Sequence, residues 1–464
     1  MQINSMYSVK IKHYNQIFTD TVRLYREAVS YLIDVCNAEW DDIVLFDAPL
    51  DKKSFVEHLI HRTKQNPHPK YDFDSRFYKF PSYLRRGAIS SAIGKASSYR
   101  SNLKNWENGD PDTRGNQPGY PKAGYIYPCF YRTDMYRRES DYTARIKVYV
   151  HNTWDWITVS LRKSDVDYIA HHCSDKKECA PILQKRGKQW YLDFCYEEYA
   201  DLTKTNIYDQ TIVAVDLGIN NACTCAVMRS DGTILGRRFL RLPREYDSLK
   251  RKIDHIRRAQ CHGSKNVRTL WKVTDGVNHD ISAKTAQFIA DTAVLYNTDC
   301  IVFEHLDTSG KKHGSRKMKL ALWRKKEVQS MTEHKVHQMG MRIARVCARN
   351  TSRLAYDGSG RTLRGKESDK TNGSYSVCEF PTGKVYNCDL NASYNIGARY
   401  FVREILKSLP VTEEQRMEAE VPPCAKRSTC TLATLINLNS ALYDSVSYLG
   451  AVPAVSGVSE SVSP

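Results

Sequence analysis

The sequence lacks three features that would point away from the cytoplasm. No stretch of the 464-residue chain reaches the roughly 18 consecutive apolar residues that a membrane-spanning helix requires. The first residues, MQINSMYSVKIK, do not contain the apolar core of a secretory signal. The 14 cysteines are scattered along the chain without the spacing of a disulfide framework. We therefore expect a cytoplasmic protein that does not insert into a membrane.

Acidic residues are outnumbered by basic ones. The chain has 69 Lys and Arg against 52 Asp and Glu, which gives a formal net charge of +17. From Ser408 onward there are 3 basic and 6 acidic residues, so residues 1–407 carry a surplus of 20 positive charges. A basic surface of this kind favours a polyanionic partner such as nucleic acid. A highly soluble basic protein without such a partner remains the alternative from charge alone.

Three acidic residues stand where a short apolar run meets a polar break. Residues 212–215 form a continuous apolar run, typical of a strand buried on both faces, and Asp216 ends it. Residues 301–303 predict a second short strand, which Glu304 follows. Asp389 occupies the predicted N-cap of a helix that has an apolar residue at every fourth position. The pattern predicts carboxylates gathered at one edge of a sheet.

Carboxylates gathered in this way repel one another, and a bound cation is the usual compensation. Ligand sets made of hard oxygens select magnesium or manganese. Two such ions, held roughly 3.5 to 4 Å apart, activate the attacking water and stabilise the leaving oxygen of a phosphodiester. We therefore expect two Mg²⁺ ions, with Mn²⁺ as a substitute, at Asp216, Glu304 and Asp389. Each acid by itself could instead be an ordinary strand end or helix cap.

The residues around these acids resemble the RuvC-like nucleases, which have an RNase H fold, of the transposon-encoded TnpB proteins and the type V CRISPR effectors. AVDLGINN is similar to the first RuvC motif, IVFEHL to the second and NCDLNASYNIGAR to the third, in the same order. The resemblance is strong over residues 206–407. Upstream it is weaker, where GNQPGYPK resembles the turn from the recognition lobe back into the wedge domain. It implies that Asp216, Glu304 and Asp389 are catalytic metal ligands in an RNA-guided DNA endonuclease, whose partners are a guide RNA and a double-stranded DNA target.

The chain departs from the family at the zinc ribbon, which usually has two CxxC pairs introduced by Thr-Ser. Thr351 and Ser352 are present, but RLAYDGSG follows without a cysteine, and the second pair is replaced by VCEFPTGKVYNC. A tetrahedral zinc site needs four ligands. Cys347, Cys378 and Cys388 could supply three of them, with a histidine from elsewhere. We expect instead a ribbon remnant without zinc, held by glycine turns and apolar contacts.

The fold class expected is multidomain α+β. Residues 19–36 have the apolar spacing of a helix, while ARIKVYV, DWITVSL and QWYLDFCYE have the composition of strands. With the resemblance, these patterns predict an RNase H-like (RuvC) α/β nuclease domain and an N-terminal β-barrel wedge domain interrupted by a helical recognition lobe. The expected boundaries are 1–15 for the first wedge strand, 16–118 for the recognition lobe, 119–205 for the wedge barrel, 206–346 and 387–408 for the two nuclease parts, 347–386 for the degenerate zinc-ribbon-like insertion, and 409–464 for a largely flexible tail.

Two basic segments are candidate nucleic-acid surfaces. In YIYPCFYRTDMYRR, aromatic side chains that can stack on bases alternate with arginines that can hold phosphate. REYDSLKRKIDHIRRAQ predicts a basic helix, which in the resembled family lies against the guide–target duplex. The alternatives are an aromatic barrel core with a basic rim for the first segment and a solvated helix face for the second. The candidates are Tyr131, Arg132, Arg137, Arg138, Lys250, Arg251, Lys252, Arg257 and Arg258.

The residues themselves support a basic, metal-dependent phosphodiesterase, and guidance by RNA rests on the resemblance. Two other functions therefore stay open. One is a structure-selective nuclease or resolvase of the same fold that needs no guide. The other is an RNA-guided repressor that binds DNA without cutting it, although all three acids stand at their motif positions. The oligomeric state stays open as well.

Overall fold

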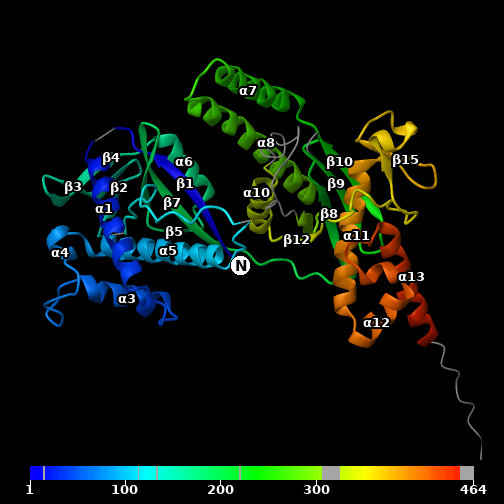
Figure 1. Ribbon diagram of the computed structural model, residues 1–464, viewed down its shortest axis with the longest axis horizontal. Helices are drawn as coiled ribbons and strands as arrows, with labels where there is room; N and C mark the ends of the chain where they lie inside the picture. The colour runs from blue at the N-terminus through cyan, green and yellow to red at the C-terminus, as the bar shows by residue number, and fades with distance from the viewer. Residues whose placement is uncertain (14–15, 113, 132–133, 219–220, 306–323, 450–464) are drawn as a thin grey trace, which may run out of the picture. The chain divides into compact units, whose positions relative to one another are not determined.

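The computed structural model describes residues 1–13, 16–112, 114–131, 134–218, 221–305 and 324–449 (Figure 1). The chain divides into two compact units. The N-terminal unit comprises Gln2–Tyr199, and the C-terminal unit comprises Ala200–Pro464 together with Met1. Within the described ranges, no helix is both long and apolar enough to span a bilayer.

The N-terminal unit begins with a strand and continues into helices. The helices are α1 (Gln16–Ala38), α2 (Trp40–Ile43), α3 (Pro49–Ile60), α4 (Phe73–Arg76), α5 (Ser82–Glu107) and α6 (Lys163–His172). Helix α1 contains the predicted helix 19–36, and Val22, Tyr25 and Leu32 of its apolar stripe are buried. This stripe packs mainly on α5. The helical segment expected after the first strand is therefore present.

The strands of the N-terminal unit form two sheets. One has β1 (Gln2–Lys10), β7 (Gln189–Tyr199), β5 (Lys177–Glu178) and β6 (Ile182–Arg186), and the other has β2 (Tyr136–Ser140), β3 (Thr143–Val150) and β4 (Thr153–Ser160). Over the described residues they do not close into a barrel, so the barrel expected for 119–205 is wrong. A tight turn at His151 and Asn152, both with positive φ, pairs β3 with β4, but no ladder joins the two sheets. Outside these sheets, backbone pairing between strands is limited to isolated bridges, such as that between Ile11 and Leu161.

Helices and strands of the N-terminal unit share one hydrophobic core. Val9 of β1, Phe18 of α1, Leu84 of α5 and Trp190 of β7 belong to the same buried cluster. Strand β1 pairs along its whole length with β7, nearly 190 positions later. The expected recognition lobe and wedge domain are therefore built on a common core.

The C-terminal unit contains a five-stranded sheet in the order β10-β9-β8-β11-β12. Strands β8, β9 and β10 form an antiparallel meander, whereas β11 runs parallel to both β8 and β12. The strands are β8 (Thr211–Asp216), β9 (Cys223–Arg229), β10 (Ile234–Leu240), β11 (Cys300–His305) and β12 (Arg342–Cys347). The helices are α7 (Pro243–Cys261), α8 (Arg268–Leu295), α10 (Lys325–Gln338), α11 (Cys388–Ser408), α12 (Val411–Glu420) and α13 (Leu432–Leu449). Single 3₁₀ turns occur at Ile207–Asp209, Gly365–Glu367, Asp369–Thr371 and Pro422–Ala425.

Helices cover both faces of this sheet, which explains the continuous apolar run in β8. Ile212 and Ala214 lie in the core formed with α11, whereas Val213 and Val215 lie in the core formed with α8 and α10. Successive residues of a strand point to opposite faces. Strand β8 is thus buried on both sides, as its sequence predicts.

The insertion between β12 and α11 has its own small sheet. It comprises β13 (Leu363–Arg364), β14 (Val377–Glu379) and β15 (Val385–Asn387). Ala355, Cys378, Phe380 and Cys388 form a compact buried cluster beneath it. Gly358 and Gly383 adopt φ values of 79° and 80°, which only glycine adopts without strain. Glycine turns and apolar contacts therefore hold this segment, in the way the sequence indicated.

The expectation of a flexible tail over 409–464 is wrong for its first part. Helices α12 and α13 follow α11 directly, and α13 packs beside α11 (Figure 1). Leu435 and Leu438 are fully buried against it. These leucines lie three residues apart, which is a helical spacing. Pro410 and Pro422 precede or open helical segments, where proline is tolerated, rather than marking disorder. Residues 450–464 lie outside the described residues.

Candidate active site

The three acidic residues are brought to one face of the five-stranded sheet. Asp216 ends β8 and Glu304 is the fifth residue of β11, and the two strands pair in parallel with Val215 opposite Phe303. Because successive side chains of a strand alternate between the two faces of the sheet, Asp216 and Glu304 lie on the same face as the residues that contact α11. Asp389 stands in the first turn of α11, which packs across β8, β9, β11 and β12. Elements distant in sequence thus converge on one edge.

Electrostatics couple these groups. Burial raises the pKa of Asp216 well above its ordinary value, and the negative charges of Glu304 and Asp389 raise it further. Burial also raises the pKa of Glu304, whereas its hydrogen bond from Thr351 and the charge of Arg399 act in the opposite direction. The carboxylates therefore oppose one another's ionisation, which is the condition that a cation would relieve.

Two of the carboxylates accept a hydrogen bond from a neutral side chain. The amide of Asn221 donates to Asp389 Oδ2 over 2.7 Å, and the hydroxyl of Thr351 donates to Glu304 Oε1. Among the described residues, no three Asp, Glu, His or Cys side chains close into a preformed metal cage. The three acids offer only oxygen donors, and the repulsion between them raises the affinity of these carboxylates for protons. This donor set fits Mg²⁺ or Mn²⁺, which prefer carboxylate oxygens.

A row of buried polar side chains on α11 fixes the segment that contains Thr351. We call Asn391, Asn395 and Arg399, spaced four residues apart, the α11 polar ladder. Asn395 donates from its Nδ2 to the carbonyl of Thr351 over 2.9 Å, and its Oδ1 accepts from the Leu432 amide. All three side chains are at least 96% buried. The ladder thereby supports the hydroxyl that contacts Glu304.

Arg399 extends the same support to the C-terminal helices. Its guanidinium donates to the carbonyls of Cys347 and Arg349, at 2.6 and 2.7 Å, and to those of Ser428 and Cys430, at 2.9 and 3.1 Å. The end of β12 and the approach to α13 are therefore joined through one buried cation. The sequence does not by itself place Thr351, Asn395 or Arg399 at this edge, although the polar residues at every fourth position of NCDLNASYNIGAR are a signal for Asn395 and Arg399.

The basic helix predicted between the first two acids is α7. Leu249 and Ile256 are buried against α8, and the five predicted basic residues are exposed. Arg251, Lys252 and Arg258 line a shallow hollow of about 710 Å³ on the outer face of the helix. The five candidates on this helix are Lys250, Arg251, Lys252, Arg257 and Arg258. A solvated face and a phosphate-binding face are both compatible with this exposure.

The other candidate surface lies in the N-terminal unit and is partly engaged by the protein itself. Tyr131 is 41% exposed and stacks on Tyr83, with 4.9 Å between ring centroids. The Arg137 guanidinium lies 4.9 Å from the centre of the Trp156 ring, and Arg138 forms an ion pair with Glu178 at 3.8 Å. Arg132 lies outside the described residues. Both the nucleic-acid and the structural interpretation of this segment stay open.

The cysteines considered for zinc separate into two places. Cys378 and Cys388 lie in the buried cluster of the insertion, and their thiols interact. Cys347 ends β12, outside that cluster, and its carbonyl accepts from Arg399. The structure thus brings together two of the three candidates. The absence of zinc stays a prediction.

Comparisons with known proteins give two kinds of likeness. The Aq_aa04 family matches residues 5–150, and the uncharacterized protein aq_aa04 of Aquifex aeolicus (strain VF5) is 34% identical over 102 residues, which are 20% of this chain and 57% of that protein. The chain thus spans little more than half of that relative. The structure is similar to that of Cas12f1 in its complex with sgRNA and target DNA, with a TM-score of 0.53, 15% identity and coverage of 82% of this chain and 81% of that one. The mini-RNA-guided endonuclease CRISPR-Cas_phi3 gives a TM-score of 0.48, 10% identity and coverage of 85% and 92%. At these identities the likeness to Cas12f1 is one of fold.

Proposed function

We propose that the protein is an RNA-guided DNA endonuclease that hydrolyses phosphodiester bonds at Asp216, Glu304 and Asp389. The observation that carries the proposal is the convergence of these acids, from β8, β11 and the start of α11, on one face of the sheet. The fold-level likeness to Cas12f1, described in complex with sgRNA and target DNA, supports the guided form of the activity.

The chemistry is divided between the residues and the ions that they would hold. Mg²⁺ bound by the three acids would supply activation of the attacking water and stabilisation of the leaving oxygen. Thr351 orients Glu304, and Asn221 orients Asp389, through the hydrogen bonds described above. The exposed lysine and arginine side chains of α7 would hold the phosphate backbone of the nucleic acid without reading its base sequence. Target choice would come from base pairing of a bound RNA and from a short flanking DNA motif.

The first experiment is to express the chain with its native flanking DNA, purify it and sequence the RNA that accompanies it. We expect one discrete RNA that ends in a variable stretch of about 20 nucleotides matching neighbouring DNA. The constant part of that RNA distinguishes a transposon origin, as in TnpB systems, from a CRISPR array. Metal-dependent cutting without a defined RNA would contradict guidance and would favour the guide-independent nuclease.

A second experiment tests the site. The reconstituted RNA complex is assayed for cleavage of matched double-stranded DNA with Asp216→Asn and with Asp209→Asn. Asp209 is exposed in the turn before β8 and has no side-chain partner among the described residues, so it controls for the loss of one carboxylate. Cleavage should be lost only in Asp216→Asn, while DNA binding persists. DNA binding without cutting by the unmodified chain would favour the guided repressor.

A further inference from the structure

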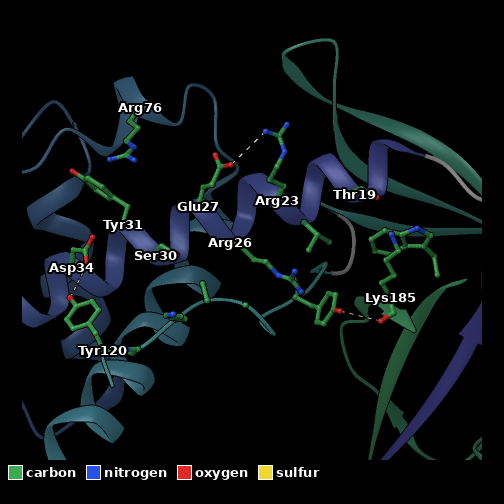
Figure 2. Close-up of a pocket in the computed structure, with 17 residues that line it drawn as sticks. Thr19, Arg23, Arg26, Glu27, Ser30, Tyr31, Asp34, Arg76, Tyr120 and Lys185 are labelled. Atoms are coloured by element: carbon green, nitrogen blue, oxygen red, sulfur yellow. Dashed lines mark hydrogen bonds and ion pairs between the residues drawn. The ribbon is translucent and has the colours of Figure 1, made fainter. Parts of the chain in front are cut away.

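An elongated groove of about 790 Å³ runs along α1 in the N-terminal unit (Figure 2). Residues of α1 at helical spacing form one wall, from Thr19 through Arg26 to Asp34. With a rise of 1.5 Å per residue this wall is roughly 22 Å long. Arg76 of α4, residues 120–127 and the β6–β7 hairpin supply the remaining lining. The dimensions suit an extended ligand better than a compact one.

Basic and aromatic side chains dominate the lining of this groove. Cation–π contacts alternate along it: Arg76 lies 5.0 Å from the ring centre of Tyr31, and Arg26 lies 4.6 Å from that of Tyr127. Arg26 also donates to the carbonyl of Ile126 over 2.9 Å, which fixes its guanidinium. The basic residues of the lining are Arg23, Arg26, Arg76, Lys122 and Lys185, the aromatic ones are Tyr31, Tyr120, Tyr127 and Trp190, and the acidic ones are Glu27 and Asp34.

Two of the cations are exposed, so a ligand can reach them. Lys122 is exposed and forms no hydrogen bond or ion pair with a described residue. The Arg23 side chain is 66% exposed, and its contacts with Asp20, at 3.4 Å, and with Glu27, at 3.9 Å (Figure 2), are surface pairs. Exposed pairs of this kind contribute little free energy. A phosphate group can therefore replace them at little cost.

Two polar atoms in the lining have no hydrogen-bond partner. The hydroxyl of Thr19 and the indole N–H of Trp190 are both buried, and neither has an acceptor or donor among the described residues. Trp190 is 98% buried. An unpaired buried donor destabilises the folded state, typically by about 1–3 kcal/mol. Both atoms have almost no exposed surface, so a ligand with oxygen acceptors would reach them only after a neighbouring side chain moves aside.

We infer that this groove binds a single strand of nucleic acid. Phosphates would lie at Arg23 and Lys122, and an unpaired base would meet the ring of Tyr120, which is 49% exposed; bases within a duplex cannot make this contact. The inference deepens the proposed function and rests on it, because it names where the N-terminal unit holds its polynucleotide. RNA and single-stranded DNA share this chemistry, so the test includes both.

Binding is measured by fluorescence anisotropy with full-length Asp216→Asn protein in EDTA, which prevents cutting. The probes are a labelled 20-nucleotide RNA, the same sequence as single-stranded DNA, and the DNA duplex. Either single strand should bind more tightly than the duplex, and a stronger RNA signal would identify RNA as the occupant. Tighter binding of the duplex would overturn the inference.

The groove variant Arg23→Gln/Lys122→Gln is compared with Lys64→Gln/Lys104→Gln, which removes two exposed lysines of the same unit outside the groove. The groove pair should weaken single-strand binding about 10-fold and reduce the slope of log K against log salt by roughly 1.4, since each single-strand phosphate contact contributes about 0.7. The control pair should change affinity less than about 2-fold. Equal effects of the two pairs would show that the groove has no special role.

Thr19→Val separates binding from folding. Removing an unpaired hydroxyl should leave the melting temperature unchanged or raise it, while single-strand affinity falls several-fold. Thr19→Ser, which keeps the hydroxyl, should restore affinity. A loss of melting temperature with unchanged affinity would mean that Thr19 is structural. Cleavage is assayed separately on the unmodified chain, so a failure of the nuclease proposal is distinguishable from a failure of this one.

Discussion

The edge of the C-terminal unit that carries Asp216, Glu304 and Asp389 and the α1 groove of the N-terminal unit differ in how some of their buried polar groups are paired. At the edge, the ladder residue Arg399 donates four hydrogen bonds to carbonyls, and Asn395 uses both ends of its amide. In the groove, Thr19 and Trp190 keep polar atoms without partners. Thr224, opposite Asp216 in β9, also keeps a buried hydroxyl without a partner, so the contrast concerns the ladder residues and not every polar group of the edge. The comparison separates positioning from binding within one chain.

The largest effect should come from Asp216→Ala. Removing one of the three mutually repelling carboxylates should reduce cleavage on the order of 1,000-fold or more, because it removes a metal ligand. Single-strand binding in the groove should change less than about 2-fold, since Asp216 belongs to the other unit. The measurement pairs a cleavage assay with anisotropy. A parallel loss of binding would break the separation between the two regions.

Arg399→Met should be the next largest change. It leaves four carbonyls without their donor in a buried site, so the free energy of unfolding should fall by about 3–5 kcal/mol. Denaturant unfolding, followed with probes in each unit, measures it. The C-terminal transition should shift while the N-terminal one stays in place. Arg399→Lys, which keeps a charge but not the planar donors, should recover only part of the loss.

Thr351→Val tests positioning alone. The variant keeps the volume of the side chain and removes the hydroxyl that donates to Glu304. Cleavage should fall about 10-fold, corresponding to loss of a hydrogen bond to a charged group. Thr351→Ser should restore it. The matched substitution in the groove, Thr19→Val, should change single-strand binding but not the rate of the cleavage step. A loss of binding in Thr351→Val together with a loss of cleavage in Thr19→Val would contradict the comparison.

The smallest predicted effect is a pH dependence of the metal requirement. Burial and neighbouring carboxylates raise the pKa of Asp216, so the metal-free site holds its proton at a higher pH than an ordinary aspartate does. As pH falls toward that raised pKa, protons compete with the metal. The Mg²⁺ concentration for half-maximal cleavage should therefore increase several-fold between pH 8 and pH 6. A requirement that is constant over this range would mean that Asp216 is already ionised.

Local pattern was enough to place the elements that carry the acids. The apolar run before Asp216 is long enough to identify a strand buried on both faces. The predicted N-cap Asp389 is wrong, because Asn387 caps α11 by accepting from the Leu390 amide and Asp389 lies inside the first turn. The catalytic role of these residues stays a prediction. The polar ladder could not be placed, because the partners of Arg399 are backbone carbonyls 29 to 52 positions away. Such bonds depend on tertiary packing and not on local propensity.

The two corrected expectations have similar causes. Helix α13 has leucines at helical spacing, but the net acidic charge and the prolines after Ser408 suggested disorder. The N-terminal strands were recognised by composition, but composition does not specify which strands pair. Closure of a barrel depends on pairing between distant strands, and here those contacts are single bridges. In both cases, long-range packing decided what a local pattern left open.

The link between the ladder and residues 428–432 also orders events during synthesis. The N-terminal unit has its last pairing partner once Tyr199 has emerged, because β1 pairs with β7. The edge that carries the three acids must wait for Leu432, more than 200 residues later. At 5–20 residues per second this interval is roughly 10–50 s. A nascent chain can therefore complete its groove well before the acidic edge is fixed.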